Sequence, residues 1–277
     1  MKICFITYNL NVTDGGGRFS YDFSESLKKN GIDINIIKTE NQNPSLNFFK
    51  IRKIFKDSDI IHAFDVWPNG FYAKVISLGL KKSIIITALG TYSVAPFYSW
   101  RRILMKWVCN RAKLIAISNY TKSEIKKVMP ELKIEVITPG FDLDFWTFGK
   151  ADDDVAIKFR PYILSVGALK PRKGYYNSIM AFAAVAEKIG GLNYVIVGQG
   201  EESDYAKNLK KIISENGLEK RVFFVSAGID DNQLLGFYKN AELFVLTPVE
   251  ENHHFEGFGI VYLEAAASGL PIVATDK

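Results

Sequence analysis

Two glutamates eight residues apart frame a glycine-containing segment near the end of the chain. Glu256 precedes a Gly-Phe-Gly sequence, and Glu264 lies inside a helix expected over residues 259–267. Carboxylate oxygens accept hydrogen bonds from vicinal hydroxyls, and the free amides at a helix N-terminus attract phosphate. A helix rises about 1.5 Å per residue, so the two carboxylates can reach opposite ends of one extended ligand. The segment predicts a site for a ligand that carries both phosphate and hydroxyl groups.

A basic cluster follows the first strand expected in the second half of the chain. Lys170, Arg172 and Lys173 stand between Gly167 and Gly174. Open α/β sheets bind ligands at the carboxyl ends of their strands, and arginine grips phosphate through two parallel hydrogen bonds. The cluster predicts a diphosphate site, with a solvated run of surface charge as the alternative.

Two further glycine clusters also follow expected strands. They are residues 15–17, with Arg18 behind them, and residues 198–200. Neither fits the dinucleotide fingerprint G-x-G-x-x-G, because Ser20 and Ser203 replace its last glycine. The first cluster predicts backbone amides close to a phosphate, with a flexible turn as the alternative. The missing fingerprint argues against a nicotinamide-dependent dehydrogenase.

Short runs rich in Ile and Val alternate with helical patterns along the whole chain, which predicts parallel sheets covered by helices. The rhythm breaks after Gly140 and restarts at Tyr162, so we expect two doubly wound domains, 1–150 and 151–277. The first helix is expected over residues 19–29. Strands are expected at 3–7, 32–37, 59–63, 84–87, 114–117 and 134–137, then at 162–166, 194–197, 222–225, 243–246 and 272–274.

Charge is divided unevenly between the two halves. Residues 1–150 carry a net charge of +9 and residues 151–277 a net charge of −4. The basic half predicts an anionic partner, namely a lipid phosphate, a membrane surface or a polyanionic acceptor, and a solvated lysine-rich surface is the alternative. The segment from Trp100 to Arg111 is either a membrane-docking helix or an ordinary amphipathic core helix.

Other features of the sequence predict a cytoplasmic protein, either free or peripheral to the inner face of the membrane. No apolar run reaches the roughly 20 residues that span a bilayer. Cys4 and Cys109 sit in apolar stretches without metal-ligand spacing, so we expect reduced buried thiols. His62 either lines a ligand site or packs in the core, while His253 and His254 either reach a ligand or cap a loop.

Taken together, these motifs resemble the retaining GT-B glycosyltransferases of the family 4 or group 1 type. In the family's order they read "GGGRFSYDF", "AISNYTKSEI", "VITPGFDLDFW", "SVGALKPRKG" and "EGFGIVYLEAAASGLPIVATD". The resemblance implies an α/β fold of the GT-B type, with two Rossmann-like domains facing a cleft. It implies transfer of a hexose-type sugar from a nucleoside-diphosphate sugar to a glycan, lipid-linked or other hydroxyl acceptor, with retention of anomeric configuration, as in polysaccharide biosynthesis. It implies no metal, no cofactor beyond this donor, and no nucleic-acid partner.

The resemblance also implies a role for each matching residue. Glu264 would bind the ribose hydroxyls, and Glu256 would face the transferred sugar. Lys173 and Arg172 would neutralise the leaving diphosphate, so these two and Glu256 form the expected catalytic set. The amides expected at the diphosphate belong to Gly16 or Gly17 in the first domain and to Phe258, Gly259 and Ile260 in the second.

Three departures from the family pattern keep an alternative open. Ala168 stands where the family often has arginine, and we expect Arg172 to supply that charge. Leu89 stands where the family often has the histidine of a His-Gly pair. The chain ends at Lys277, which predicts a shortened second domain completed by another copy or a second chain. The alternative is a catalytically weak subunit that binds a sugar nucleotide or serves as a scaffold.

Overall fold

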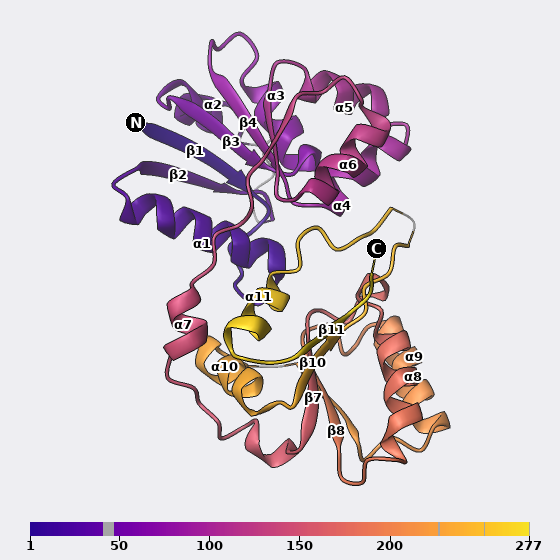
Figure 1. Cartoon of the computed structure of the whole chain (residues 1–277). Helices are drawn as coiled ribbons and strands as arrows, with labels where there is room; N and C mark the ends of the chain where they lie inside the picture. Colours follow the sequence, from indigo (N-terminus) through magenta and orange to yellow (C-terminus); the bar gives the residue numbers. More distant parts are fainter. Residues whose placement is uncertain (41–46, 227, 252, 277) are drawn as a thin grey trace. The chain divides into compact units, whose positions relative to one another are not determined.

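The computed structural model describes residues 1–40, 47–226, 228–251 and 253–276. These form two units, Met1–Gly140 and Phe141–Lys277, each built on its own parallel sheet (Figure 1). The division lies ahead of the predicted boundary at residue 150 because helix α7, Leu143–Phe148, packs within the second unit. Trp146 of α7 is buried, contacts the Tyr238 ring edge-on at 5.4 Å, and accepts a hydrogen bond from Ser268.

The first unit contains a six-stranded sheet with the order β2-β1-β3-β4-β5-β6. Connections change direction between β1 and β3, so the loops after these two strands flank the point where open α/β sheets bind ligands. Most residues of β1 and β3 are buried, which explains their Ile-rich composition. The strands are β1 Lys2–Thr7, β2 Asp33–Lys38, β3 Ile60–Phe64, β4 Ser83–Ala88, β5 Lys113–Ala116 and β6 Ile134–Val136.

Helix α1, Gly15–Lys29, begins earlier than predicted, since the glycines form its first turn instead of a loop before it. Asp14 caps this helix by accepting a hydrogen bond from the Gly17 amide at 2.7 Å. Gly17 must be glycine for a packing reason: a Cβ there would lie 2.2 Å from Asn9 Oδ1. The other helices of this unit are α2 Phe48–Lys56, α3 Phe71–Ile76, α4 Thr91–Val94, α5 Arg102–Cys109 and α6 Asn119–Val128.

The core of the first unit contains a cluster of aromatic rings between the sheet and α1. Phe5 and Phe64 meet edge-on at 4.5 Å, and Phe23 of α1 meets His62 edge-on at 5.2 Å. His62 Nε2 and Thr87 Oγ1 are 2.8 Å apart and share a hydrogen bond. Burial lowers the pKa of His62 to about 4, so the ring is neutral at pH 7. Two roles were predicted for His62, and the structure supports the second: a core residue whose ring is packed and hydrogen-bonded.

The second unit contains a five-stranded sheet with the order β11-β10-β7-β8-β9. Helices α8 and α9 cover one face, and α10 and α11 lie on the other (Figure 1). Strands β7, β9, β10 and β11 have the predicted bounds. The elements are β7 Tyr162–Val166, α8 Tyr175–Ala186, β8 Asn193–Val197, α9 Asp204–Glu215, β9 Val222–Val225, α10 Asp231–Asn240, β10 Leu243–Leu246, α11 Ile260–Ala267 and β11 Ile272–Ala274.

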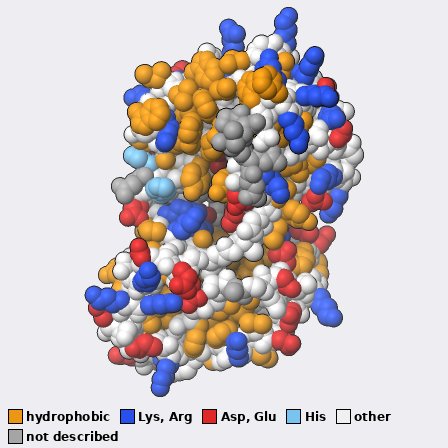
Figure 2. Space-filling model, turned by 180° about the vertical axis from the view of Figure 1, so that it is seen from behind, with side chains coloured by type: hydrophobic (Ala, Val, Ile, Leu, Met, Phe, Trp, Pro, Cys, Tyr) orange, Lys and Arg blue, Asp and Glu red, His pale blue; other side chains and the backbone are white. Residues whose placement is uncertain are grey.

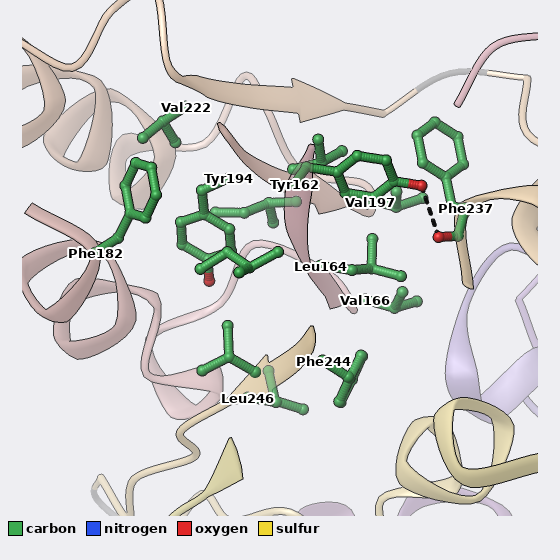
Figure 3. Packing of buried hydrophobic residues seen from close by; sticks show 14 of the residues in the cluster. Tyr162, Leu164, Val166, Phe182, Tyr194, Val197, Val222, Phe237, Phe244 and Leu246 are labelled. Atoms are coloured by element: carbon green, nitrogen blue, oxygen red, sulfur yellow. Dashed lines mark hydrogen bonds between the residues drawn. The ribbon is translucent and has the colours of Figure 1, made fainter. Parts of the chain in front are cut away.

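Aromatic and branched side chains from both faces fill the core of the second unit (Figure 3). Tyr162 and Tyr194 are fully buried, and their hydroxyls have partners. Tyr162 donates to the Phe237 carbonyl at 2.7 Å, and Tyr194 Oη lies 2.7 Å from Ser165 Oγ. These bonds let large polar-tipped rings fill the core without the cost of an unpaired buried hydroxyl.

The structure bears on two further features of the sequence, the two cysteines and the possible membrane spans. Cys4 and Cys109 are buried and free, and burial raises the pKa of each thiol to about 12. The predicted buried thiols are therefore confirmed. Across the described ranges, no helix combines the length and the apolar character that a membrane span requires.

Candidate functional site

In the second sheet the connections change direction between β7 and β10. From β7 the chain proceeds to β8 and β9 on one side, whereas β10 and β11 lie on the other side. Open α/β sheets bind ligands at the carboxyl ends of the strands at such a point. The loop after β7 carries the basic cluster, and the loop after β10 carries Glu256. The topology therefore unites two motifs that lie far apart in the sequence.

Glu256 is the centre of a largely buried ion-pair cluster at this point. Its Oε2 accepts a hydrogen bond from Lys173 Nζ at 2.9 Å and another from Arg172 Nη1. The Lys173 side chain is 8% exposed and that of Glu256 18%. The three residues expected to form the catalytic set therefore lie in direct contact, although 84 positions separate Arg172 from Glu256.

Burial and charge oppose each other within this cluster. Burial favours the neutral form of Glu256, but Lys173 and Arg172 outweigh it and hold the pKa of the carboxyl below its usual range. Burial lowers the pKa of Lys173, and the attraction of Glu256 offsets only part of that effect. Two cations share one carboxylate, so the cluster keeps an excess of positive charge that suits an anionic ligand.

The backbone of the two loops holds Lys173 and Arg172 in place. Gly174 has a left-handed conformation with φ 69°, and a Cβ there would lie 1.7 Å from the Thr247 carbonyl oxygen. Thr247 Oγ1 donates to the Gly174 carbonyl at 2.9 Å, and the Val249 amide donates to the Arg172 carbonyl at 3.0 Å. Only glycine at position 174 allows this close approach, which sets the position of the basic cluster against the Glu256 loop.

Glu264 is held by a different element of the second unit. It lies on α11 and accepts a hydrogen bond from Tyr238 Oη of α10 at 2.7 Å. Burial raises the pKa of Tyr238 well above its ordinary value, and the Glu264 charge raises it further. Tyr238 therefore stays protonated and acts as a fixed hydrogen-bond donor that orients the Glu264 carboxylate.

Phe258, Gly259 and Ile260 lie where predicted, at the start of α11. Gly259 is the N-cap residue, and its carbonyl accepts a hydrogen bond from the Tyr262 amide at 3.0 Å. Amides in the first turn of an α-helix have no acceptor within the helix, so they can bind an anion. Whether they contact a diphosphate remains a prediction.

Gly16 and Gly17 belong to the first unit and lie in the first turn of α1. The Gly17 amide already donates to the Asp14 carboxylate, which is itself an anion at this helix N-terminus. Of the two predicted contacts to phosphate, Gly16 is therefore the better candidate.

A hollow of about 520 Å³ lies at the ends of β8 and β9. Glu201, on its wall, accepts hydrogen bonds from Ser226 Oγ at 2.6 Å and from Lys210 Nζ at 2.9 Å. The other lining residues are Gln199, Gly200, Glu202 and Gly228. The hollow takes in part of the third glycine cluster, whose role the sequence left open.

The remaining candidates concern histidine and metal. His253 and His254 are exposed, and His254 pairs its backbone with Glu251. In the part of the chain that the structure describes, no three His, Cys, Asp or Glu side chains are grouped so that they could hold a metal ion.

Asp65, directly after β3, is a half-buried residue with a buried carboxyl group that sequence reasoning missed. Its Oδ1 accepts hydrogen bonds from the Leu89 amide at 3.0 Å and from Ser93 Oγ at 2.7 Å. Burial raises its pKa to about 6, although both hydrogen bonds favour the charged form. One signal was available: Asp65 is the sole acidic residue between Asp59 and Glu124. Asp65 thus fixes the loop that carries Leu89.

Asp65→Asn should make the free energy of unfolding less dependent on pH. The pKa of Asp65 is about 6 in the folded chain against an ordinary 3.8, so between these values the folded state keeps a proton that the unfolded chain loses. The wild type therefore loses stability as pH rises through this window, by roughly 3 kcal/mol at pH 7. Asparagine keeps the Oδ1 acceptor but cannot ionise. Urea unfolding of both proteins at pH 4.5 and pH 7 checks this, and a stability difference that is the same at both pH values would contradict it.

Comparisons with known proteins agree with the resemblance in the sequence. Residues 150–277 match the family model described as "Glycosyl transferases group 1", and residues 38–145 match "Glycosyltransferase Family 4". A GDP-mannose-dependent alpha-(1-6)-phosphatidylinositol monomannoside mannosyltransferase of Mycobacterium tuberculosis is 29% identical over 166 residues, which cover 57% of this chain and 42% of the relative. This chain therefore matches less than half the length of that relative.

Among the solved structures that match nearly the whole chain, two represent different proteins. The structure of Anabaena HepE in complex with UDP-glucose matches with a TM-score of 0.75 and 20% identity, covering 99% of this chain and 80% of the other. Sucrose-phosphate synthase from Thermosynechococcus elongatus matches with a TM-score of 0.73 and 18% identity, covering 99% and 81%. At such identities the match demonstrates the fold, and the predicted fold class is confirmed.

Proposed function

Because the chain belongs to the group 1 glycosyltransferases and has the GT-B fold, we propose that it moves a hexose-type sugar from a nucleoside-diphosphate sugar to a hydroxyl acceptor, either a glycan or a lipid-linked sugar. The observation that carries the proposal is the ion-pair cluster of Arg172, Lys173 and Glu256 at the switch point of the second sheet. The mycobacterial relative is named as GDP-mannose-dependent, and HepE was solved with UDP-glucose, which supports a nucleotide-sugar donor.

The proposed chemistry follows from where charge develops. Breaking the bond between the anomeric carbon and the diphosphate oxygen leaves an oxocarbenium-like sugar and an additional negative charge on the diphosphate. Lys173, Arg172 and the N-terminus of α11 would stabilise that charge as it forms, without a metal ion. We expect the nucleobase of the donor to occupy the hollow at the ends of β8 and β9, which lies at the same edge of the second sheet as the ion-pair cluster.

We also propose that the configuration of the anomeric carbon is retained by attack from the side of the leaving group. The acceptor oxygen bonds to the anomeric carbon while its proton passes to the departing phosphate oxygen, so no protein nucleophile is needed. The state of Glu256 supports this: its charge is shared by two cations, which makes it a poor nucleophile.

A binding and turnover screen tests the proposal. UDP, GDP, ADP and their sugars are titrated calorimetrically into the protein in the presence of EDTA, and release of free sugar is measured beside binding. We expect one nucleotide series to bind without metal. If EDTA abolishes binding, the proposal that no metal is needed is wrong. If no nucleotide binds, the proposal of a nucleotide-sugar donor is wrong. Binding without turnover would favour the scaffold alternative, to which Leu89 in place of histidine points.

Glu264→Ala should weaken nucleoside-diphosphate binding by about 1–3 kcal/mol, the scale of hydrogen bonds to a charged group. Tyr238→Phe should have a smaller effect, because the carboxylate remains and only its orienting donor is lost. Glu187→Ala, at an exposed carboxylate of the same unit, is the matched control. Calorimetric titration gives the affinities. Unchanged affinity with lowered turnover would show that Glu264 has the role assigned to Glu256.

A further inference from the structure

The first unit has an exposed aromatic and basic surface around α5 that the proposed reaction does not use. Trp100 and Ile103 are 79% and 80% exposed. On the face of this unit seen in Figure 2, hydrophobic side chains gather beside Lys and Arg. We use the name α5 surface for Tyr98, Trp100, Arg101, Arg102, Ile103, Lys106 and Trp107.

The exposed face of α5 is not needed by the core. The helix already buries Met105, Val108 and Cys109 on its inner side. Ile103 and Trp107 are four residues apart on α5, so they share the opposite face, and the exposed Trp100 lies two residues before the helix begins. An apolar cluster of this kind on a protein surface marks a site of interaction.

The chain segment that carries this surface has charge of one sign. Between residues 66 and 123 the chain has nine Lys or Arg residues and no Asp or Glu. The nine are Lys74, Lys81, Lys82, Arg101, Arg102, Lys106, Arg111, Lys113 and Lys122. This run supplies most of the positive excess of the first unit and favours a partner that is itself anionic.

Arg101 provides a second, independent indication of an anionic partner. Its guanidinium lies over the rings of Trp67 and Trp100, at 4.8 and 5.1 Å from their centroids. Within the described part of the chain, Arg101 Nε is buried and has no hydrogen-bond partner. The two indoles hold the cation beside the apolar residues, as in side chains that place an apolar body in lipid and a charged tip at the headgroups.

We propose that the α5 surface docks on an anionic lipid bilayer, with Trp100 and Ile103 among the lipid headgroups and Arg102 and Lys106 on lipid phosphates. Basic residues interleaved with Trp and aliphatic side chains are typical of interfacial helices. The segment from residue 66 to residue 123 carries basic residues without an acidic one, which favours an anionic bilayer over a protein surface of mixed charge. Aromatic rings with basic residues also suit single-stranded nucleic acid, and the experiment includes that outcome.

Flotation with vesicles tests the proposal on the whole chain. Phosphatidylcholine vesicles are compared with vesicles that contain 30% phosphatidylglycerol, in 0.1 M NaCl. We expect the protein to bind the anionic vesicles and not the neutral ones. Arg102→Glu with Lys106→Glu should lower partitioning by more than about 30-fold, because losing two basic residues at an anionic surface costs that much and the introduced carboxylates add repulsion. Trp100→Ser with Ile103→Ser should lower it by about tenfold.

Matched variants of the second unit serve as controls. Lys188→Glu with Lys220→Glu changes the net charge by the same amount, and Tyr176→Ser with Ile189→Ser removes two exposed apolar side chains. Both should leave vesicle binding unchanged. Nucleotide affinity should be the same in all four variants, which shows that each is folded and separates this test from that of the proposed function. Equal binding of wild type and α5-surface variants, equal binding to neutral vesicles, or binding to a single-stranded oligonucleotide but not to vesicles would overturn the proposal.

Discussion

Replacing Lys173 with methionine should lower the rate of sugar transfer by about 10²–10³-fold, the usual cost of losing one group that stabilises developing charge. Lys173 is the most deeply buried cation of the cluster, and its ammonium lies 2.9 Å from Glu256. Charge interactions are stronger where water is excluded, so this lysine should contribute more than an exposed one. Methionine keeps the apolar stem that packs in the loop. The rate constant kcat from initial-rate measurements at saturating donor checks the expectation.

Two further variants distinguish catalysis from stability. Lys170→Met removes an exposed charge from the same loop and should leave kcat almost unchanged. Lys173→Met leaves the buried Glu256 with Arg172 alone, and breaking a buried pair destabilises a protein. Adding Glu256→Gln should restore much of that stability without restoring kcat. If the double variant regained the rate, the contribution of Lys173 would be structural.

The fold of the second unit could be predicted from its sequence more closely than that of the first. β10 is a continuous apolar run between Glu242 and Thr247, and β7 is apolar apart from Ser165 and lies between Pro161 and Gly167, so the ends of both strands are visible in the sequence. The predicted start of α1 was wrong, because glycine is a poor helix former and residues 15–17 were interpreted as a loop. Asp14 offsets that propensity by capping the helix, and Gly17 is required by the close approach of Asn9. Both effects depend on three-dimensional contacts, which the spacing of residues in the sequence does not reveal.

The site divides in the same way. The family resemblance implied that Arg172, Lys173 and Glu256 belong to one ligand site, but it did not predict their mutual ion pair. That contact depends on the strand order, which puts β10 beside β7. Asp65 was missed because a single carboxylate after a strand has no motif, and its raised pKa comes from burial alone. A sequence displays residue types along the chain, whereas burial and long-range pairing arise only when the sheet is assembled.

Glu256→Gln should lower kcat by about 10²-fold and at the same time strengthen the binding of the free nucleoside diphosphate. The Glu256 carboxylate pairs with Lys173 and Arg172, the cations that a diphosphate would need. An incoming diphosphate must therefore compete with an internal anion. Glutamine has the same shape without the charge, so it releases the cations, and we expect the affinity for the free diphosphate to rise about tenfold.

The opposite signs of the two effects make this variant informative. A residue that only supports the fold would lose affinity and rate together, whereas one that only binds substrate would lose affinity with an unchanged kcat. Glu256 should exchange its cations for the transferred sugar when the donor binds, and its pairing with them keeps a buried charge satisfied until then. Glu251→Gln, an exposed carboxylate of the same loop, is the control and should change neither quantity. A Glu256→Gln variant with weakened diphosphate binding would show that the carboxylate and the diphosphate do not share these cations, and the site of the leaving group would then have to lie elsewhere on the sheet edge.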